Sequence, residues 1–242
     1  LADDPMEESM TRTVMISGAS RGIGAAIAQR MQAAGWNVSL GLRRPETADP
    51  DTPQRLACRY DALEPDSERA WIRATIARFG RLDGLVLSAG IHSRATVLEA
   101  ADEEFDQLIA VNVKSPMRLA RLAWPHLEAL PDGKPHPGRI VLMSSLSGKR
   151  VKSAGSGLYG ISKFALMGLA QGLRQCGRDN RVRTTAICPS FVATDMAAGV
   201  VQDMSKLTRP EDIAAIVETV LGLPPTASVA DIPVHWSVED CY

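Results

Sequence analysis

The sequence is poor in cysteine, and its few cysteines are badly placed for disulfides or metal ions. Cys58, Cys176, Cys188 and Cys241 are far apart, with no Cys-x-x-Cys pair and no cluster with histidine. This spacing argues against a disulfide framework and against a zinc site. We therefore expect three reduced and mostly buried thiols, a fourth near the C-terminus, and no bound metal.

Long apolar runs and an excess of one charge are also missing. No run approaches the about 20 apolar residues that a membrane-spanning helix needs, and no positively charged, apolar leader opens the sequence. The net charge is only -1, and the basic residues form no stripe with aromatic side chains, which disfavours nucleic acid. With the reduced cysteines, these absences predict a cytoplasmic protein that binds neither a membrane nor nucleic acid.

What the sequence does contain is a regular alternation of short apolar runs and longer helical patterns. We predict strands at 13–17, 37–42, 56–59, 84–88, 139–144, 182–188 and 230–235, and helices at 22–34, 66–79, 102–130, 157–177 and 210–221. This alternation is typical of a Rossmann-like α/β fold, a doubly wound and mainly parallel seven-stranded sheet with helices on both faces. The acidic, aperiodic residues 1–10 predict a flexible tail before a single domain at 11–242.

The stretch SGASRGIG, residues 17–24, lies between the first predicted strand and the first predicted helix. Gly18 would make the turn off the strand, Gly22 would let a ligand approach the backbone, and Gly24 would let the helix lie close to the sheet. Free amides and the helix dipole at such a turn favour a phosphate group. The spacing GxxxGxG differs from the common GxGxxG pattern, so a ligand-free structural turn is the alternative.

Five further motifs follow the glycine turn. They are LSAG (87–90), VNV (111–113), MSSLSG (143–148), YGISK (159–163) and ICPSFVATD (187–195). With these motifs in this order, the chain resembles the short-chain dehydrogenase/reductase family from about residue 11 to about residue 235. The resemblance implies an NAD(P)-binding Rossmann domain that transfers hydride between a nicotinamide and a carbonyl or alcohol substrate.

Tyr159 and Lys163 are four residues apart on a predicted helix and therefore share one face. A tyrosine has a pKa near 10, and a nearby ammonium lowers it toward the range useful for acid–base catalysis. Alone, the pair would equally suit a solvated helix. The resemblance implies that Tyr159 exchanges the proton with the substrate and that Lys163 holds the nicotinamide ribose.

Two more catalytic residues follow from the resemblance. Ser145 would hydrogen-bond the substrate oxygen, while its neighbour Ser144 would point the other way, as alternate strand residues do. Asn112, inside a predicted helix, would mark a helix distortion and a water link to Lys163. The alternative for Asn112 is a tolerated polar residue.

The second predicted strand bears on the choice of cofactor. An acidic residue at its end would bind the ribose of NAD, but Leu42 stands there, followed by Arg43 and Arg44. These guanidinium groups, with Arg21 in the glycine turn, suit the 2′-phosphate of NADP. The sequence thus predicts NADP(H) rather than NAD(H), and a solvated turn is the alternative.

The resemblance also implies contacts with the rest of the cofactor. Asp61 would bind the adenine, and Thr194 the carboxamide. Ser88 and Ser190 replace an asparagine and a glycine that are usual in the family. The complete predicted cofactor site is Gly18, Ser20, Arg21, Gly22, Ile23, Gly24, Arg43, Arg44, Asp61, Ala89, Gly90, Tyr159, Lys163, Pro189, Val192 and Thr194.

Three functions remain open for such a chain. The first is an NADPH-dependent carbonyl or 3-oxoacyl reductase. The second is an NADP-linked dehydrogenase of an alcohol, sugar or amino alcohol, and the third is a catalytically silent protein that senses a dinucleotide. By family habit, the helices at 102–130 and 157–177 would form a homotetramer or homodimer.

Five cations near the predicted site bear on the substrate. They are His92, Arg94, Lys149, Arg150 and Lys152. They would suit a small-molecule substrate with an anionic group. Solvated loop charge is the alternative.

Overall fold

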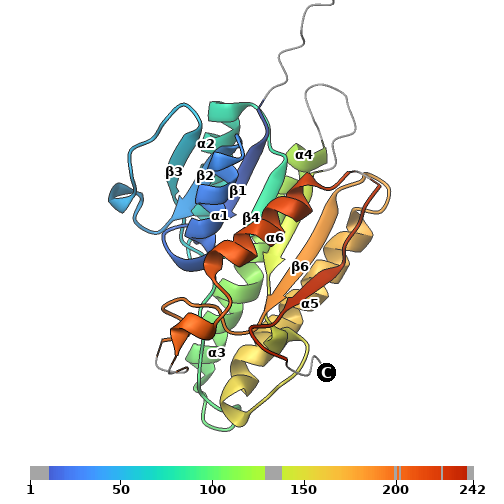
Figure 1. The fold of residues 1–242 in the computed structure, drawn as a ribbon. Helices are drawn as coiled ribbons and strands as arrows, with labels where there is room; N and C mark the ends of the chain where they lie inside the picture. Colours follow the sequence, from blue (N-terminus) through green and yellow to red (C-terminus); the bar gives the residue numbers. More distant parts are fainter. Residues whose placement is uncertain (1–10, 129–137, 199–200, 202, 225, 239–242) are drawn as a thin grey trace, which may run out of the picture.

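The fold is built on one seven-stranded sheet (Figure 1). A computed structural model describes residues 11–128, 138–198, 201, 203–224 and 226–238. The strands are β1 (Thr13–Ser17), β2 (Asn37–Leu42), β3 (Arg55–Arg59), β4 (Gly84–Leu87), β5 (Arg139–Met143), β6 (Arg183–Pro189) and β7 (Asp231–Val234). Their order is β3-β2-β1-β4-β5-β6-β7, and every neighbouring pair is parallel. The predicted tail at 1–10 and Cys241 lie outside the described residues.

The described part of the chain has six α-helices. They are α1 (Gly22–Ala33), α2 (Pro65–Phe79), α3 (Asp102–Ile109), α4 (Ser115–Glu128), α5 (Gly157–Cys176) and α6 (Pro210–Gly222). All but α3 cover the two faces of this sheet (Figure 1). The α1 and α6 helices lie on one face, and α2, α4 and α5 lie on the other. The predicted doubly wound α/β fold is confirmed.

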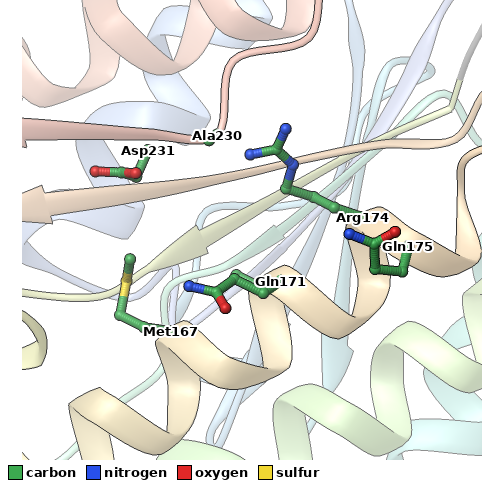
Figure 2. Close-up of a pocket in the computed structure, with 7 residues that line it drawn as sticks. Met167, Gln171, Arg174, Gln175, Ala230 and Asp231 are labelled. Atoms are coloured by element: carbon green, nitrogen blue, oxygen red, sulfur yellow. The ribbon is translucent and has the colours of Figure 1, made fainter.

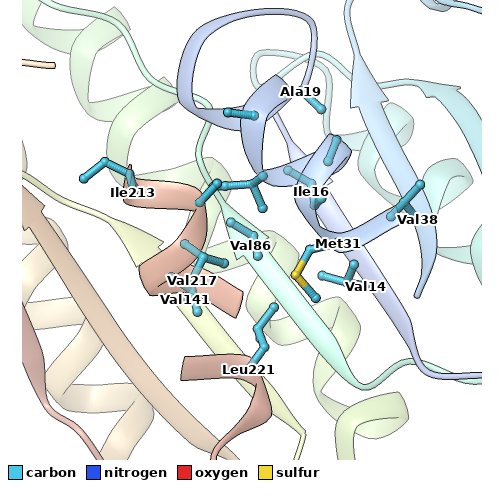
Figure 3. Close-up of a cluster of buried hydrophobic side chains, with 14 of the residues drawn as sticks. Val14, Ile16, Ala19, Met31, Val38, Val86, Val141, Ile213, Val217 and Leu221 are labelled. Atoms are coloured by element: carbon cyan, nitrogen blue, oxygen red, sulfur yellow. The ribbon is translucent and has the colours of Figure 1, made fainter. Parts of the chain in front are cut away.

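The strands are buried because both of their faces meet helices. All residues of β1, β4 and β5 are buried. Ile16, Val86 and Val141 point toward α1 and α6, where they meet Met31 and Val217 (Figure 3). Continuous apolar strands of this kind are typical of a parallel sheet between two helical layers.

Local residues explain several element ends. Pro65 and Pro210 begin α2 and α6, positions at which a missing amide hydrogen costs little. Gly80 ends α2 with φ of 73°, the left-handed conformation that favours glycine.

The predicted helix at 102–130 is not one helix. A π-helical turn at Ala110–Lys114 separates α3 from α4, and residues 129–130 lie outside the described part. Pro116 lacks an amide hydrogen, so the carbonyl of Asn112 cannot receive the usual α-helical hydrogen bond. The distortion predicted around Asn112 is therefore present, with a physical cause in the sequence.

The cysteine prediction was partly wrong. Cys188 is buried, but Cys58 is half-buried and Cys176 is exposed, and all three are free thiols. The last turn of α5 faces solvent at Cys176, a detail that apolar content alone does not reveal.

Among the described residues, no helix has the length and apolar character needed to cross a membrane.

The strand order determines where a site can form. From β1 the chain continues to β2 and β3 on one side, while β4 pairs with the other side of β1. The connections therefore diverge between β1 and β4. In open parallel sheets, ligands bind beyond the carboxyl ends of the strands at such a point.

Candidate active site

The turn between β1 and α1 is as tight as the glycines predict. Gly18 has φ of 68°, and a Cβ there would lie 2.8 Å from the Cα of Ala89. A Cβ on Gly24 would lie 2.3 Å from the carbonyl oxygen of Gly18. These positions exclude any side chain, so α1 begins directly against the turn.

The start of α1 fits a phosphate group. Its first turn has no acidic residue, and Arg21, at the N-cap, makes no capping hydrogen bond with its side chain. Gly22 has φ of 56° and leaves the backbone bare, while Ser20 is exposed and Ile23 half-buried on the same turn. Uncapped amides and the positive end of a helix dipole favour an anion here. The residues present thus fit the pyrophosphate of a dinucleotide.

The loop after β5 presents Ser145 and turns Ser144 away. The Ser145 hydroxyl accepts a hydrogen bond from the amide of Ser147 at 3.1 Å and donates to the carbonyl of Pro189 at 3.4 Å. The Ser144 hydroxyl is buried and donates to the carbonyl of Lys163 at 3.5 Å. The side chain of Ser145, not that of Ser144, also hydrogen-bonds Tyr159.

Tyr159 and Lys163 lie in the first two turns of α5. The Lys163 ammonium is 5.5 Å from the centroid of the Tyr159 ring and donates to the carbonyl of Met143 at 2.9 Å. Both side chains are buried. Burial lowers the pKa of Lys163 to about 8.

The prediction that Lys163 lowers the pKa of Tyr159 is wrong for the protein without a ligand. Burial raises the pKa of Tyr159 well above its usual range, and the hydrogen bond between Tyr159 and Ser145 only partly offsets this. Desolvation of the phenolate exceeds any help from an ammonium whose own charge is disfavoured by burial. Tyr159 is therefore a protonated phenol, ready to donate a proton.

Asn112 joins three parts of the site. Its side-chain amide donates to the carbonyl of Ile91 at 2.9 Å and to the Ser162 hydroxyl at 3.0 Å, and its oxygen accepts from the Ile91 amide at 2.9 Å. A Cβ on Gly90 would lie 3.3 Å from Asn112 Oδ1 and 3.8 Å from Lys163 Nζ. Asn112 thus fixes the loop after β4 against α5, close to Lys163.

The cations predicted to bind the 2′-phosphate follow β2. Arg43 and Arg44 are exposed, and their guanidinium groups make no ion pair within the described part of the chain.

The carboxylate of Asp61, which was predicted to bind the adenine, accepts a hydrogen bond from the Leu63 amide at 3.0 Å. Asp61 thus stabilises the turn after β3.

A contact that the sequence reasoning did not predict supports the loop after β4. The hydroxyl of Ser17 accepts hydrogen bonds from the amides of Ser88 and Ala89, each at 3.1 Å. Ser17 thus fixes Ala89 beside Gly18. The signal in the sequence was the hydroxyl that opens the glycine stretch.

Comparison with known proteins identifies the family. A sequence model of the family described as short chain dehydrogenase matches residues 12–205. This chain belongs to the short-chain dehydrogenase/reductase family. The members of this family are oxidoreductases that use a nicotinamide dinucleotide.

Three similar proteins illustrate the relationship. Agropine synthesis reductase of Rhizobium rhizogenes is 34% identical over 230 residues, which are 93% of this chain but 52% of that protein, so the chain spans about half of it. Oxidoreductase UcpA of Escherichia coli (strain K12) is 30% identical over 226 residues, covering 91% of this chain and 82% of UcpA. A short chain dehydrogenase from Burkholderia cenocepacia J2315, solved in complex with NADP, is 28% identical with a TM-score of 0.83, covering 94% of this chain and 98% of that one.

Two cations of the candidate site have ion-pair partners that the sequence did not reveal. Arg21 Nη1 lies 2.7 Å from Asp195 Oδ2, and Lys149 Nζ lies 2.6 Å from Asp231 Oδ2. The carboxylate compensates the positive charge in each pair. Lys149 is therefore not the free cation that the sequence suggested for an anionic substrate.

A groove lies between α5 and β7, next to the ion pair of Lys149 and Asp231. Figure 2 shows its lining side chains, which come from the C-terminal half of α5 and the start of β7. It is lined by Met167, Ala170, Gln171, Arg174, Gln175, Ala230 and Asp231. None of these is a predicted site residue.

In the described part of the chain, no group of three or more His, Cys, Asp or Glu side chains is placed to hold a metal ion.

Proposed function

We propose that the chain is an NADP(H)-dependent reductase of a carbonyl substrate. The observation that carries the proposal is the meeting of Tyr159, Ser145 and Lys163 at the carboxyl edge of the sheet. The phosphate-fitting glycine turn lies at the same edge. Acid, orienting hydroxyl and cofactor cradle then share one site.

The protein's part in the reaction follows from these side chains. A bound NADPH supplies the hydride for the carbonyl carbon. The Ser145 hydroxyl orients the carbonyl oxygen by a hydrogen bond, and the Tyr159 phenol donates its proton to that oxygen as the alcohol forms. Burial keeps this proton on Tyr159 until it is transferred. The ammonium of Lys163, which donates a hydrogen bond to the carbonyl of Met143, stabilises the negative charge of the Tyr159 phenolate that remains after proton transfer.

The preference for NADP(H) rests on Arg43 and Arg44. Both are exposed and have no ion pair in the described residues, and Leu42 stands where a carboxylate would repel a 2′-phosphate. The NADP complex of the similar Burkholderia cenocepacia enzyme supports this choice.

The cofactor preference is tested by Arg43→Ala. Loss of a charge-assisted hydrogen bond should raise the Kd of NADPH about 10- to 100-fold, with the Kd of NADH changed less than about twofold. Titration of nicotinamide fluorescence measures both constants. Equal losses for both cofactors would refute the phosphate-binding role of Arg43.

The reductase reading is tested with matched carbonyl and alcohol substrates. We expect turnover of carbonyls with NADPH to exceed turnover of the corresponding alcohols with NADP. A reversed preference would favour the alcohol, sugar or amino-alcohol dehydrogenase. Tight NADPH binding without turnover of any substrate would favour the silent dinucleotide sensor.

The substrate side of the site is bounded by His92. Its ring centroid lies 4.5 Å from that of Tyr159. Burial, with the nearby charges of Arg94 and Lys163, lowers the pKa of His92, so at neutral pH it offers a hydrogen bond rather than a charge. We propose that His92 and Arg94 receive a polar or anionic group of the substrate.

The helices α4 and α5 also offer a surface for self-association. Met117, Ile161 and Phe164 are exposed apolar residues on these helices. We propose that this surface forms a homodimer, alone or within a homotetramer. Analytical ultracentrifugation should show a mass at least twice that of the chain, and Phe164→Glu should lower it.

A further inference from the structure

An exposed ion pair joins two segments that are distant in the sequence and meet at the carboxyl edge of the sheet. Arg21 lies within the glycine turn, and Asp195 lies 174 residues later in the strap, our name for residues 190–198 after β6. The two side chains are 72% and 74% exposed. Burial does not impose this contact, so attraction between the two charges is what holds it.

The strap is fixed to the body of the protein before it reaches Asp195. The amide of Ala193 donates to the carbonyl of Thr208 at 2.9 Å, and Val192 is buried in the hydrophobic core. A Cβ on Gly22 would lie 3.2 Å from Thr194 Cγ2, so the strap crosses directly over the glycine turn. The segment around Asp195 is thus held from one side, and Arg21 holds it from the other.

We propose that Arg21 and Asp195 form a clasp that closes the strap over the glycine turn and slows the release of a bound dinucleotide. This inference rests on the proposed function. In the clasp, the charge of Arg21 is compensated by a carboxylate, so Arg21 does not read the 2′-phosphate. That selection belongs to Arg43 and Arg44, whose charges have no such partner in the described residues.

Simple electrostatics and the clasp make opposite predictions for Asp195. A carboxylate near an anionic ligand repels it, so removing the carboxylate would strengthen binding if Asp195 acted through its field alone. If Asp195 holds Arg21, removing it opens the strap and speeds release. The variant Asp195→Asn therefore decides between the two roles while barely changing the size of the side chain.

The test uses stopped-flow displacement of NADPH and of NADH from the full chain. Exposed ion pairs change an equilibrium by about two- to fivefold, so Arg21→Gln and Asp195→Asn should each speed release of both cofactors by about that factor. The double variant should release them no faster than either single variant, because both changes break one contact. Glu218→Gln is the matched control, since it removes the carboxylate of another long-range pair, with Arg30. It should leave both rates unchanged.

Two results would overturn the clasp alone. One is slower release from Asp195→Asn, and the other is a loss of affinity in Arg21→Gln that is confined to NADPH. Failure of the unaltered chain to bind either cofactor would overturn the proposed function and the clasp with it. Retained NADPH selectivity in Arg43→Ala, with selectivity lost in Arg21→Gln, would transfer the phosphate-reading role to Arg21.

Discussion

Two buried cations lie at opposite ends of the same strand, β5. Arg139 is its first residue, and Lys163 reaches from α5 to the carbonyl of Met143, its last residue. Their relative exposures are 2% and 5%. Burial lowers the pKa of both, with Arg183 adding to the effect on Arg139. Both positions therefore carry the cost of taking a positive charge out of water.

The two cations differ in what their hydrogen bonds accomplish. Arg139 Nη2 donates to the carbonyls of Leu223 and Pro224 at 2.8 Å and of Ala227 at 3.2 Å, just after α6. It secures a chain segment at the amino edge of the sheet. Lys163 has one such carbonyl and faces the Tyr159 ring. A buried cation alone therefore does not indicate an active site. A buried cation beside a titratable side chain, at the carboxyl edge of the sheet, does indicate one.

The largest expected effect is that of Tyr159→Phe. Loss of the general acid should lower kcat about 10²- to 10⁴-fold, because the substrate oxygen loses its proton donor. The Kd of NADPH should stay within about twofold, since the ring remains. Steady-state kinetics and fluorescence titration measure the two quantities.

Tyr60→Phe is the matched control for that experiment. Tyr60 is also a buried tyrosine, but its hydroxyl hydrogen-bonds Ser115 at 2.8 Å, in contact with Glu68 and away from the proposed site. The control should keep its kcat. A Tyr159→Phe enzyme with most of its kcat would remove Tyr159 from the mechanism.

The next effect separates the two buried cations. Arg139→Met leaves carbonyls without their donor and should lower the free energy of unfolding by about 2–4 kcal/mol while the folded enzyme still turns over. Lys163→Met should abolish turnover and change the free energy of unfolding by less than about 1 kcal/mol, because the lost hydrogen bond is offset by removal of a buried charge. Urea unfolding and kcat at low temperature test both. If Lys163→Met lost stability and Arg139→Met lost turnover, the structural role would belong to Lys163 and the role in turnover to Arg139.

Local pattern predicted most of the sheet, and the family resemblance named the candidate site residues that the fold brings together. The predicted strand at 13–17 and the observed β1 have the same bounds, because a doubly buried strand is an apolar run between breakers. Ser145 was chosen over Ser144 from the family resemblance together with strand alternation, and the two hydroxyls do turn in different directions.

Contacts between distant segments could not be predicted from the sequence. Nothing near Arg21 or Lys149 indicates that Asp195 and Asp231 neutralise them, because those partners arrive only when β6 and β7 are in place. The prediction that Lys163 lowers the pKa of Tyr159 was wrong for a related reason. The Lys163 neighbour is visible in the sequence, but the burial that outweighs it belongs to the folded chain.

The smallest effect is a dependence of stability on pH that Lys163 should show and Arg139 should not. Burial lowers the pKa of Lys163 from 10.5 to about 8, so the folded chain binds this proton more weakly than the unfolded chain. Below pH 8 both states are protonated and the cost of burial is fully present. Between pH 8 and 10.5 the folded state loses the proton first, and the cost disappears.

The unaltered chain should therefore gain about 2 kcal/mol of stability relative to Lys163→Met between pH 7 and pH 10. Urea unfolding of both proteins at the two pH values gives this difference, in which titration of all other groups cancels. The same comparison with Arg139→Met should show no change, because a guanidinium stays protonated throughout this range. A pH-independent difference for Lys163→Met would mean that the ammonium is solvated. Its hydrogen bond to Met143 would then not be the contact that places it beneath Tyr159.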